Sequence, residues 1–118
     1  MRGVLLPPGR IELLQGFIQQ KPDDPFPRYA LAQEYKNAGR LEEARATFEH
    51  LMTATPDYTA TYLHAGNVLA ALSRTAEAIE VYRRGIAVCV RRGDAHARGE
   101  LEGALATLEA TAAESRGG

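Results

Sequence analysis

The chain has little of what marks exported, membrane-bound or nucleic-acid-binding proteins. Its 118 residues include one cysteine, Cys89, so no disulfide can form within the chain, and a reducing setting such as the cytoplasm is expected. A net charge of -1 provides no long-range field to attract nucleic acid or an anionic membrane. No apolar run approaches the ~20 residues that span a bilayer. Residues 1–8 contain too short an apolar run for a signal peptide, so we expect neither export nor membrane insertion.

Patterns for catalysis, metals and cofactors are also missing. The three histidines are predicted to lie on three different helices, which gives no metal-ligand spacing; they are His50, His64 and His96. Cys89 shares a helical stripe with Ala78 and Tyr82, which predicts a small buried residue rather than a nucleophile. There is no glycine-rich phosphate loop and no nucleophile elbow. We therefore expect no cofactor, no metal and no enzymatic activity.

Hydrophobic residues recur at helical spacing in every long segment, and no segment has the alternation of a strand. Proline and glycine fall between these segments, where they end one helix and permit the next. The pattern predicts an all-α protein of about six helices in a single domain. The predicted helices cover residues 10–20, 25–38, 41–54, 58–71 and 76–92, followed by a last helix after Gly93-Asp94.

An internal repeat organises these helices. Ala44-x3-Phe48 recurs 34 residues later as Ala78-x3-Tyr82. The same offset carries Leu31-Ala32-x2-Tyr35 onto Ala65-Gly66-x2-Leu69. A fixed period of this length indicates stacked supersecondary units, none of which buries its apolar face alone. The small residues should let neighbouring helices approach while the large ones fill the space between layers.

These residues resemble the tetratricopeptide repeat, whose pattern is Trp-x2-Leu-Gly-x2-Tyr, then Ala-x3-Phe, then Pro. The chain is similar to small bacterial proteins of this family with two full repeats, which implies an antiparallel helix-hairpin stack with a right-handed superhelical sense. Departures include Arg28 for the aromatic residue, Ser73 where the first copy has Gly39, and Val90 for the proline. The predicted units are a half repeat (10–20), repeat one (25–58), repeat two (59–92) and a capping helix (94–115). The capping helix fits the pattern poorly, with His96, Gly99 and Gly103 at key places.

The resemblance implies a protein-protein interaction scaffold that holds a peptide segment in a concave groove lined by the first helix of each repeat. Helical geometry places one set of side chains on the face away from the stack. Tyr29 would supply an aromatic contact, Gln33 and Asn67 would meet an extended backbone, and Lys36 a carboxylate. The alternative is a solvated helix face. The candidate groove residues are Phe26, Tyr29, Gln33, Lys36, Asn37, Leu63, His64, Asn67 and Arg98.

Three other functions compete with this one. A subclass of the family grips a terminal carboxylate with lysine, asparagine and arginine residues, but Tyr29 and Gln33 stand where the clamp would have lysine and asparagine, so we do not expect that activity. A solvated face explains the arginines better than an acidic or nucleic-acid partner; they are Arg74, Arg83, Arg84, Arg91, Arg92 and Arg98. The alternative function is homo-oligomerisation, for example as a homodimer, through the exposed ends of the stack, with Leu101, Leu105 and Leu108 as the expected contact residues.

Overall fold

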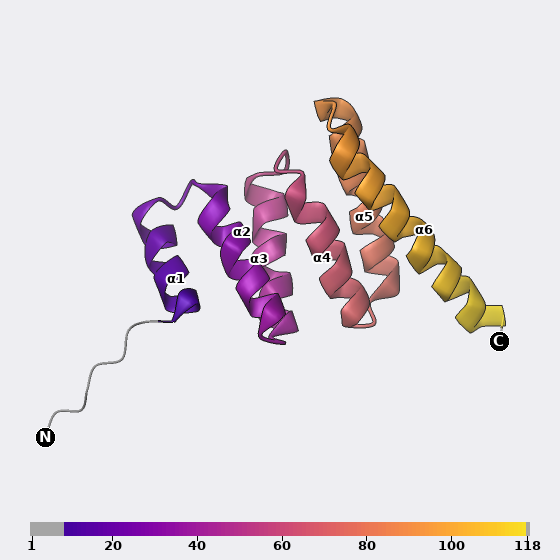
Figure 1. Ribbon diagram of the computed structural model, residues 1–118, viewed down its shortest axis with the longest axis horizontal. Coiled ribbons are helices and arrows are strands. Elements are labelled where there is room, and N and C mark those ends of the chain that lie inside the picture. Colours follow the sequence, from indigo (N-terminus) through magenta and orange to yellow (C-terminus); the bar gives the residue numbers. More distant parts are fainter. Residues whose placement is uncertain (1–8, 118) are drawn as a thin grey trace, which may run out of the picture.

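The structure, a computed structural model, describes residues 9–117 (Figure 1). Within that range the chain forms six helices and no strand, which confirms the predicted all-α fold. The expectation about a signal peptide concerns residues 1–8, which lie outside the described part. The helices are α1 (Arg10–Gln20), α2 (Pro25–Asn37), α3 (Leu41–Ala54), α4 (Ala60–Ala71), α5 (Thr75–Arg92) and α6 (Ala95–Gly117).

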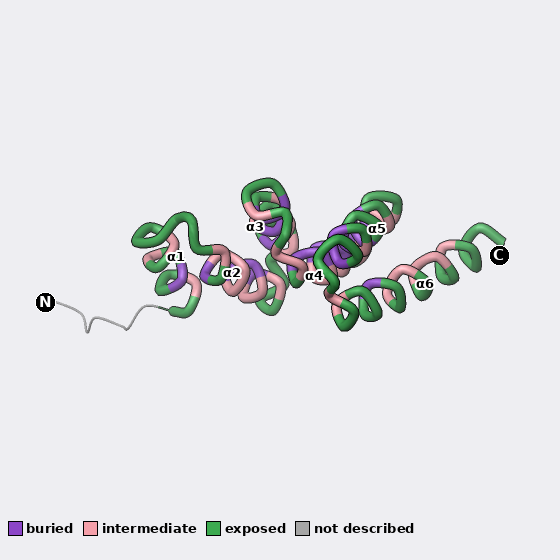
Figure 2. The backbone as a smooth tube through the Cα atoms, turned by 90° about the horizontal axis from the view of Figure 1, so that it is seen from above, coloured by how far each residue is buried: buried purple, intermediate pink, exposed green. Residues whose placement is uncertain are grey.

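Each helix packs against the next along the chain, so the stack is built from antiparallel hairpins and extends over 63 × 36 × 20 Å. The helices α2, α4 and α6 also contact one another directly, in the order α2, α4, α6. No such contact joins α1 to α3 or α3 to α5 within the described chain. The stack is therefore curved, with α2, α4 and α6 on its inner face and α1, α3 and α5 on its outer face (Figure 2).

The two hairpin turns are closed in the same way. Gly39 has φ 76° and Ser73 has φ 63°, so the serine adopts the left-handed conformation that its glycine counterpart adopts easily. The residue after each one donates its backbone N–H to a carbonyl of the preceding helix: Arg40 to Tyr35 at 2.8 Å and Arg74 to Leu69 at 2.9 Å. The 34-residue offset thus holds in backbone geometry even where the side chain differs.

Small residues hold the helices close together, as predicted. Ala32, Ala44 and Ala78 are fully buried. A Cβ added at Gly66 would lie 2.5 Å from Cδ1 and 2.8 Å from Cζ of Tyr82, nearer than a real Cβ approaches such atoms. The ring of Tyr82 fills the space that this glycine leaves, so the pair sets the separation of α4 and α5.

The first helix of each repeat is tied to the turn that precedes it by an equivalent contact. The hydroxyl of Tyr62 donates to the carbonyl of Pro56 at 2.6 Å. In the first repeat, the guanidinium of Arg28 donates to the carbonyl of Pro22 at 2.9 Å. These two pairs occupy matching repeat positions, so an arginine and a tyrosine make the same hydrogen bond from different side-chain shapes.

The last helix packs through the stripe that the sequence predicts and not through the repeat positions. Leu101 is 0% exposed, and its side chain lies against Gly85, which also faces Tyr62. Gly99 and Gly103 have nothing within 4 Å of where a Cβ would be. The expectation that Leu101 is open to a second copy is therefore wrong, because this single chain already covers it.

The apolar surface left at an end of the stack lies on α1 instead. Leu13 is 46% exposed and Phe17 is 50% exposed, one helical turn apart. Leu105 and Leu108 on α6 are partly buried against the core. The two ends of the stack therefore differ, with the larger open apolar residues at the α1 end.

Candidate functional site: a hollow on the inner face

A hollow of about 210 Å³ opens on the inner face where α2, α4 and α6 meet. All three helices contribute to its lining, which is mixed in polarity: aromatic and aliphatic carbon, a hydroxyl, an imidazole and a carboxylate. The lining residues are Tyr29, Thr59, Ala60, Leu63, His64, Ala97, Glu100 and Leu101.

An aromatic cluster forms one wall of the hollow and fixes the ring of Tyr29. Its ring centroid lies 5.6 Å from that of Tyr58, 5.8 Å from that of His64 and 6.3 Å from that of Phe48, each in an edge-on arrangement. Such geometry adds to the stabilisation that burial alone provides. Burial, and then the neighbouring Tyr58, raise the pKa of Tyr29, so its hydroxyl stays protonated and can donate a hydrogen bond.

His64 lies between a cation and an anion in this wall. Its Nδ1 is 3.5 Å from the ammonium of Lys36, and its ring stacks on Phe48 at 6.4 Å. Burial first, and then Lys36, lower the pKa of His64, while Glu100 acts in the opposite direction. The imidazole is consequently held neutral and can accept a hydrogen bond through Nδ1.

The position of α6 beside the groove is set at its first residues. Asp94 caps the helix by accepting the N–H of Ala97 at 3.1 Å. Its other oxygen accepts the hydroxyl of Thr59, which precedes α4, at 2.8 Å. These bonds lower the pKa of Asp94, with the Thr59 bond as the larger cause. The carboxylate thereby ties the start of α6 to the start of α4.

The structure brings four of the nine predicted groove residues together: Tyr29, Leu63 and His64 line the hollow, and Lys36 touches His64. Gln33 is half-buried on the same helix as Tyr29, and its Oε1 has no hydrogen-bond partner in the described structure. Phe26 is exposed near the start of α2.

The remaining three predicted residues have other surroundings. Asn67 Oδ1 accepts the hydroxyl of buried Tyr82 at 2.5 Å, so this carboxamide supports the core. Asn37 lines a separate hollow between α1 and α2. Arg98 is exposed and pairs along α6 with Glu102 at 3.2 Å.

Sequence reasoning named Arg98 on α6 but missed the α6 residues that line the hollow, and it missed the segment before α4. Ala97 could have been found, because the repeat offset leads from Tyr29 to Leu63 and then to Ala97. Glu100 carries no such signal, since the offset aligns it with the small residue Gly66. Its place in the hollow follows from the different packing of α6.

The arginines do not form an open basic patch. Arg91 pairs with Asp57 at 2.8 Å and Arg83 with Glu109 at 2.7 Å. Arg74 pairs with Glu77 at 2.8 Å, and the guanidinium of Arg84 lies 6.0 Å from the ring centre of Tyr62. These contacts agree with a solvated, internally balanced face.

The histidines, acidic residues and cysteine of the described range form no metal site or exposed thiol. Residues 9–117 contain no group of three or more His, Cys, Asp or Glu residues placed to hold a metal ion. Cys89 is 1% exposed, and burial raises the pKa of its thiol. None of the described helices combines the length and the apolar character needed to cross a membrane.

Known proteins share both the sequence pattern and the fold. The family model described as tetratricopeptide repeat matches residues 28–58. A tetratricopeptide repeat domain protein from Salinibacter ruber, solved by NMR in solution, is 41% identical, with 76% of this chain and 91% of that chain covered and a TM-score of 0.72. The chain belongs to the tetratricopeptide repeat family.

Two further structures agree with this assignment. A crystal structure of a tetratricopeptide repeat domain protein from Salinibacter ruber is 41% identical over 74% of this chain and 97% of that chain, with a TM-score of 0.71. The TPR2B domain of yeast Sti1, described in a complex with pHsp70, has a TM-score of 0.80 over 86% of this tetratricopeptide repeat chain and 81% of its own. At 14% identity it shows the fold alone. No curated protein sequence gives a significant match.

Proposed function

We propose that this tetratricopeptide repeat protein is a non-catalytic interaction module that holds a segment of a partner protein in the inner-face hollow. The observation that carries the proposal is the convergence of Tyr29, Leu63 and Ala97, one repeat position on the three inner-face helices α2, α4 and α6, on a single hollow. A cytoplasmic setting remains part of the proposal, on the ground of the single cysteine.

The chemistry of the hollow suits an extended segment with an apolar side chain. Tyr29 and Leu63 offer rigid apolar area, which contributes affinity at low entropic cost. Glu100 offers an anion on the α6 side and Lys36 a cation on the α2 side, so the groove also has an electrostatic direction. The Sti1 domain described with pHsp70 supports partner binding as a property of the fold, and says nothing of which partner this chain binds.

The groove can be tested with variants that block it without removing core side chains. Ala60 and Glu100 are exposed residues of the lining, and Ala87 is an exposed alanine on α5. We expect Ala60→Arg and Glu100→Arg to abolish capture of natural partners from an extract of the source cells. Ala87→Arg should capture them as the unmodified protein does, and all three should unfold at similar temperatures.

Replacing both Tyr29 and Asn67 by alanine would be a weaker test of the groove. Tyr29 is packed against three aromatic neighbours, and Asn67 supports Tyr82. Loss of binding in that variant would be mixed with loss of stability. Partner capture that survives both Ala60→Arg and Glu100→Arg would contradict the proposed groove.

Self-association is the second candidate, and we propose the α1 end for it. Leu13 and Phe17 form the exposed apolar pair there. Sedimentation over a range of concentrations should show reversible association that Phe17→Glu abolishes. A monomer at every concentration would remove this function.

A further inference from the structure

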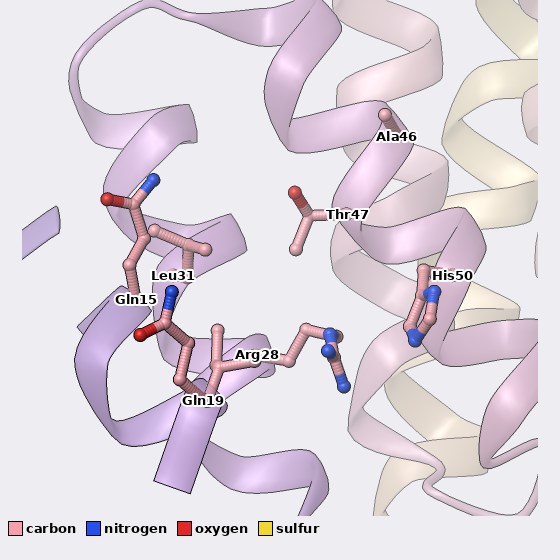
Figure 3. Close-up of a pocket in the computed structure, with 8 residues that line it drawn as sticks. Gln15, Gln19, Arg28, Leu31, Ala46, Thr47 and His50 are labelled. Carbon is pink, nitrogen blue, oxygen red and sulfur yellow. The ribbon is translucent and has the colours of Figure 1, made fainter. Parts of the chain in front are cut away.

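A larger hollow, of about 610 Å³, lies on the outer face between α1 and α3, with α2 as its floor (Figure 3). Figure 3 shows Gln15 and Gln19 of α1 on one side, Ala46, Thr47 and His50 of α3 on the other, and the side chain of Arg28 extending across the space between them. Leu31 and Ile18 supply aliphatic surface. This hollow lies on the opposite side of the stack from the groove of the proposed function.

The repeat supplies an internal comparison, because α3 and α5 enclose an equivalent hollow over α4. The offset of 34 residues carries Gln15 onto Glu49, Ala46 onto Glu80 and His50 onto Arg84. The second hollow is lined by three glutamates, Glu49, Glu77 and Glu80. The lining of the first contains no acidic residue, and its volume is about 610 Å³ against about 320 Å³.

Arg28 explains why the first hollow is open and gives it a positive charge. The equivalent residue, Tyr62, is 1% exposed and its ring fills the space beside Gly85. Arg28 is only half-buried, and it has no acidic group within 4.0 Å among the described residues. One of its five N–H groups donates to Pro22, so donors remain for a ligand. His50 lies exposed beside it and adds an imidazole N–H donor.

One acidic residue, Asp23, lies near Arg28. Asp23 lines a neighbouring hollow that shares Arg28 and His50 with the first. It is exposed and makes no ion pair with Arg28. The carboxylate of Asp23 therefore leaves Arg28 available on the side that faces Gln19 and Thr47.

We propose that this outer-face hollow binds an acidic segment of a protein. A glutamate or aspartate side chain of the segment accepts hydrogen bonds from Arg28 and His50. A neighbouring aliphatic side chain packs on Ile18 and Leu31, and the carboxamide of Gln19 meets the backbone of the segment. Charge complementarity selects this occupant, since the lining carries a cation and donors but no carboxylate, unlike the equivalent hollow one repeat later.

The experiment titrates the full chain with three pentapeptides, each acetylated and amidated so that no free terminus contributes. Their central residues are Leu-Glu-Leu, Leu-Gln-Leu or Leu-Lys-Leu, flanked by alanine. Heteronuclear NMR reports which amides shift. The glutamate peptide should shift amides around Arg28, Ile18 and His50, with an affinity that falls as salt is added. The glutamine and lysine peptides should bind more than about tenfold more weakly.

A variant that copies residues of the second hollow into the first supplies the control. Gln15→Glu combined with Ala46→Glu gives the first hollow the carboxylates of the second, at exposed helical positions. It should weaken the glutamate peptide more than about tenfold and leave thermal unfolding unchanged. Glu80→Ala, in the second hollow, and Ala60→Arg, in the inner groove, should leave the affinity unchanged.

Several outcomes would overturn the proposal. They are an absence of shifts at millimolar glutamate peptide, equal binding of the three peptides, shifts confined to the inner face, or unchanged affinity in the double glutamate variant. None of these outcomes would refute the inner groove, whose blocking variants are different residues.

Discussion

Replacing Gly66 by alanine should lower the free energy of unfolding by about 1–3 kcal/mol. The new methyl group would lie 2.5 Å from Cδ1 of Tyr82, whereas ordinary contacts begin near 3.4 Å. Since Tyr82 is 3% exposed, its ring has no solvent to move into. The substitution therefore forces two helices apart or the tyrosine out of its position.

The expected change in the free energy of unfolding combines two losses and one gain. Overpacking of a close-packed core costs about 1–3 kcal/mol. Movement of the Tyr82 ring also strains the hydrogen bond from its hydroxyl to Asn67 Oδ1, at 2.5 Å, which contributes about 1 kcal/mol. In a helix interior, alanine stabilises the helix by about 1 kcal/mol relative to glycine, and this gain offsets one of the two losses.

Urea unfolding measures the difference, and α6 provides matched controls. Gly99 and Gly103 have nothing within 4 Å of an added Cβ. The same glycine-to-alanine change should raise the free energy of unfolding there, by about 0.5–1 kcal/mol. The reasoning fails if Gly66→Ala is as stable as Gly103→Ala, since the two changes would then have the same cost despite opposite surroundings.

Further predictions concern the hairpin turn and the groove. Ser73→Gly should raise the free energy of unfolding by about 0.5–1 kcal/mol, because glycine adopts the left-handed conformation without strain. Gly39→Ser should lower the free energy of unfolding by a similar amount. Changes of the same sign in urea unfolding would contradict this prediction. Because the folded pKa of His64 lies below its usual value of 6.5, its stabilising contribution is complete above that pH. The contribution is lost as pH falls from 6.5 to the lowered folded pKa, and His64→Gln should flatten this part of the stability profile. By NMR titration, Lys36→Met should raise the pKa of His64 and Glu100→Gln should lower it further; shifts of the opposite sign would refute the assignment.

Much of the fold was predictable because the residues of the repeat pattern are the ones that pack between neighbouring helices. Ala44 and Ala78 are small where helices approach, and both are fully buried. Ser73 was aligned with Gly39 by the same offset, and the backbone of both turns is alike. In each case the residue at one position suits both its own turn or helix and the packing of the whole stack, so the repeat can be recognised from the sequence.

The groove was only partly predictable because a helix face does not reveal long-range partners. Helical spacing put Tyr29 and His64 on one face, and both line the inner-face hollow. Asn67 shares their face, but Tyr82 on the next helix takes its carboxamide oxygen. Arg98 lies outside the hollow and Glu100 lines it, because α6 packs through Leu101 and not through the repeat positions.

The most direct test of the inner groove is site-specific photo-crosslinking. A benzophenone side chain is placed in turn at Ala60, at Glu100 and at Ala87, all of which are exposed. We predict that the captured partner becomes joined to the chain from the first two positions and not from Ala87, which lies on α5 of the outer face. Crosslinks that form from Ala87 but from neither groove position would contradict the account.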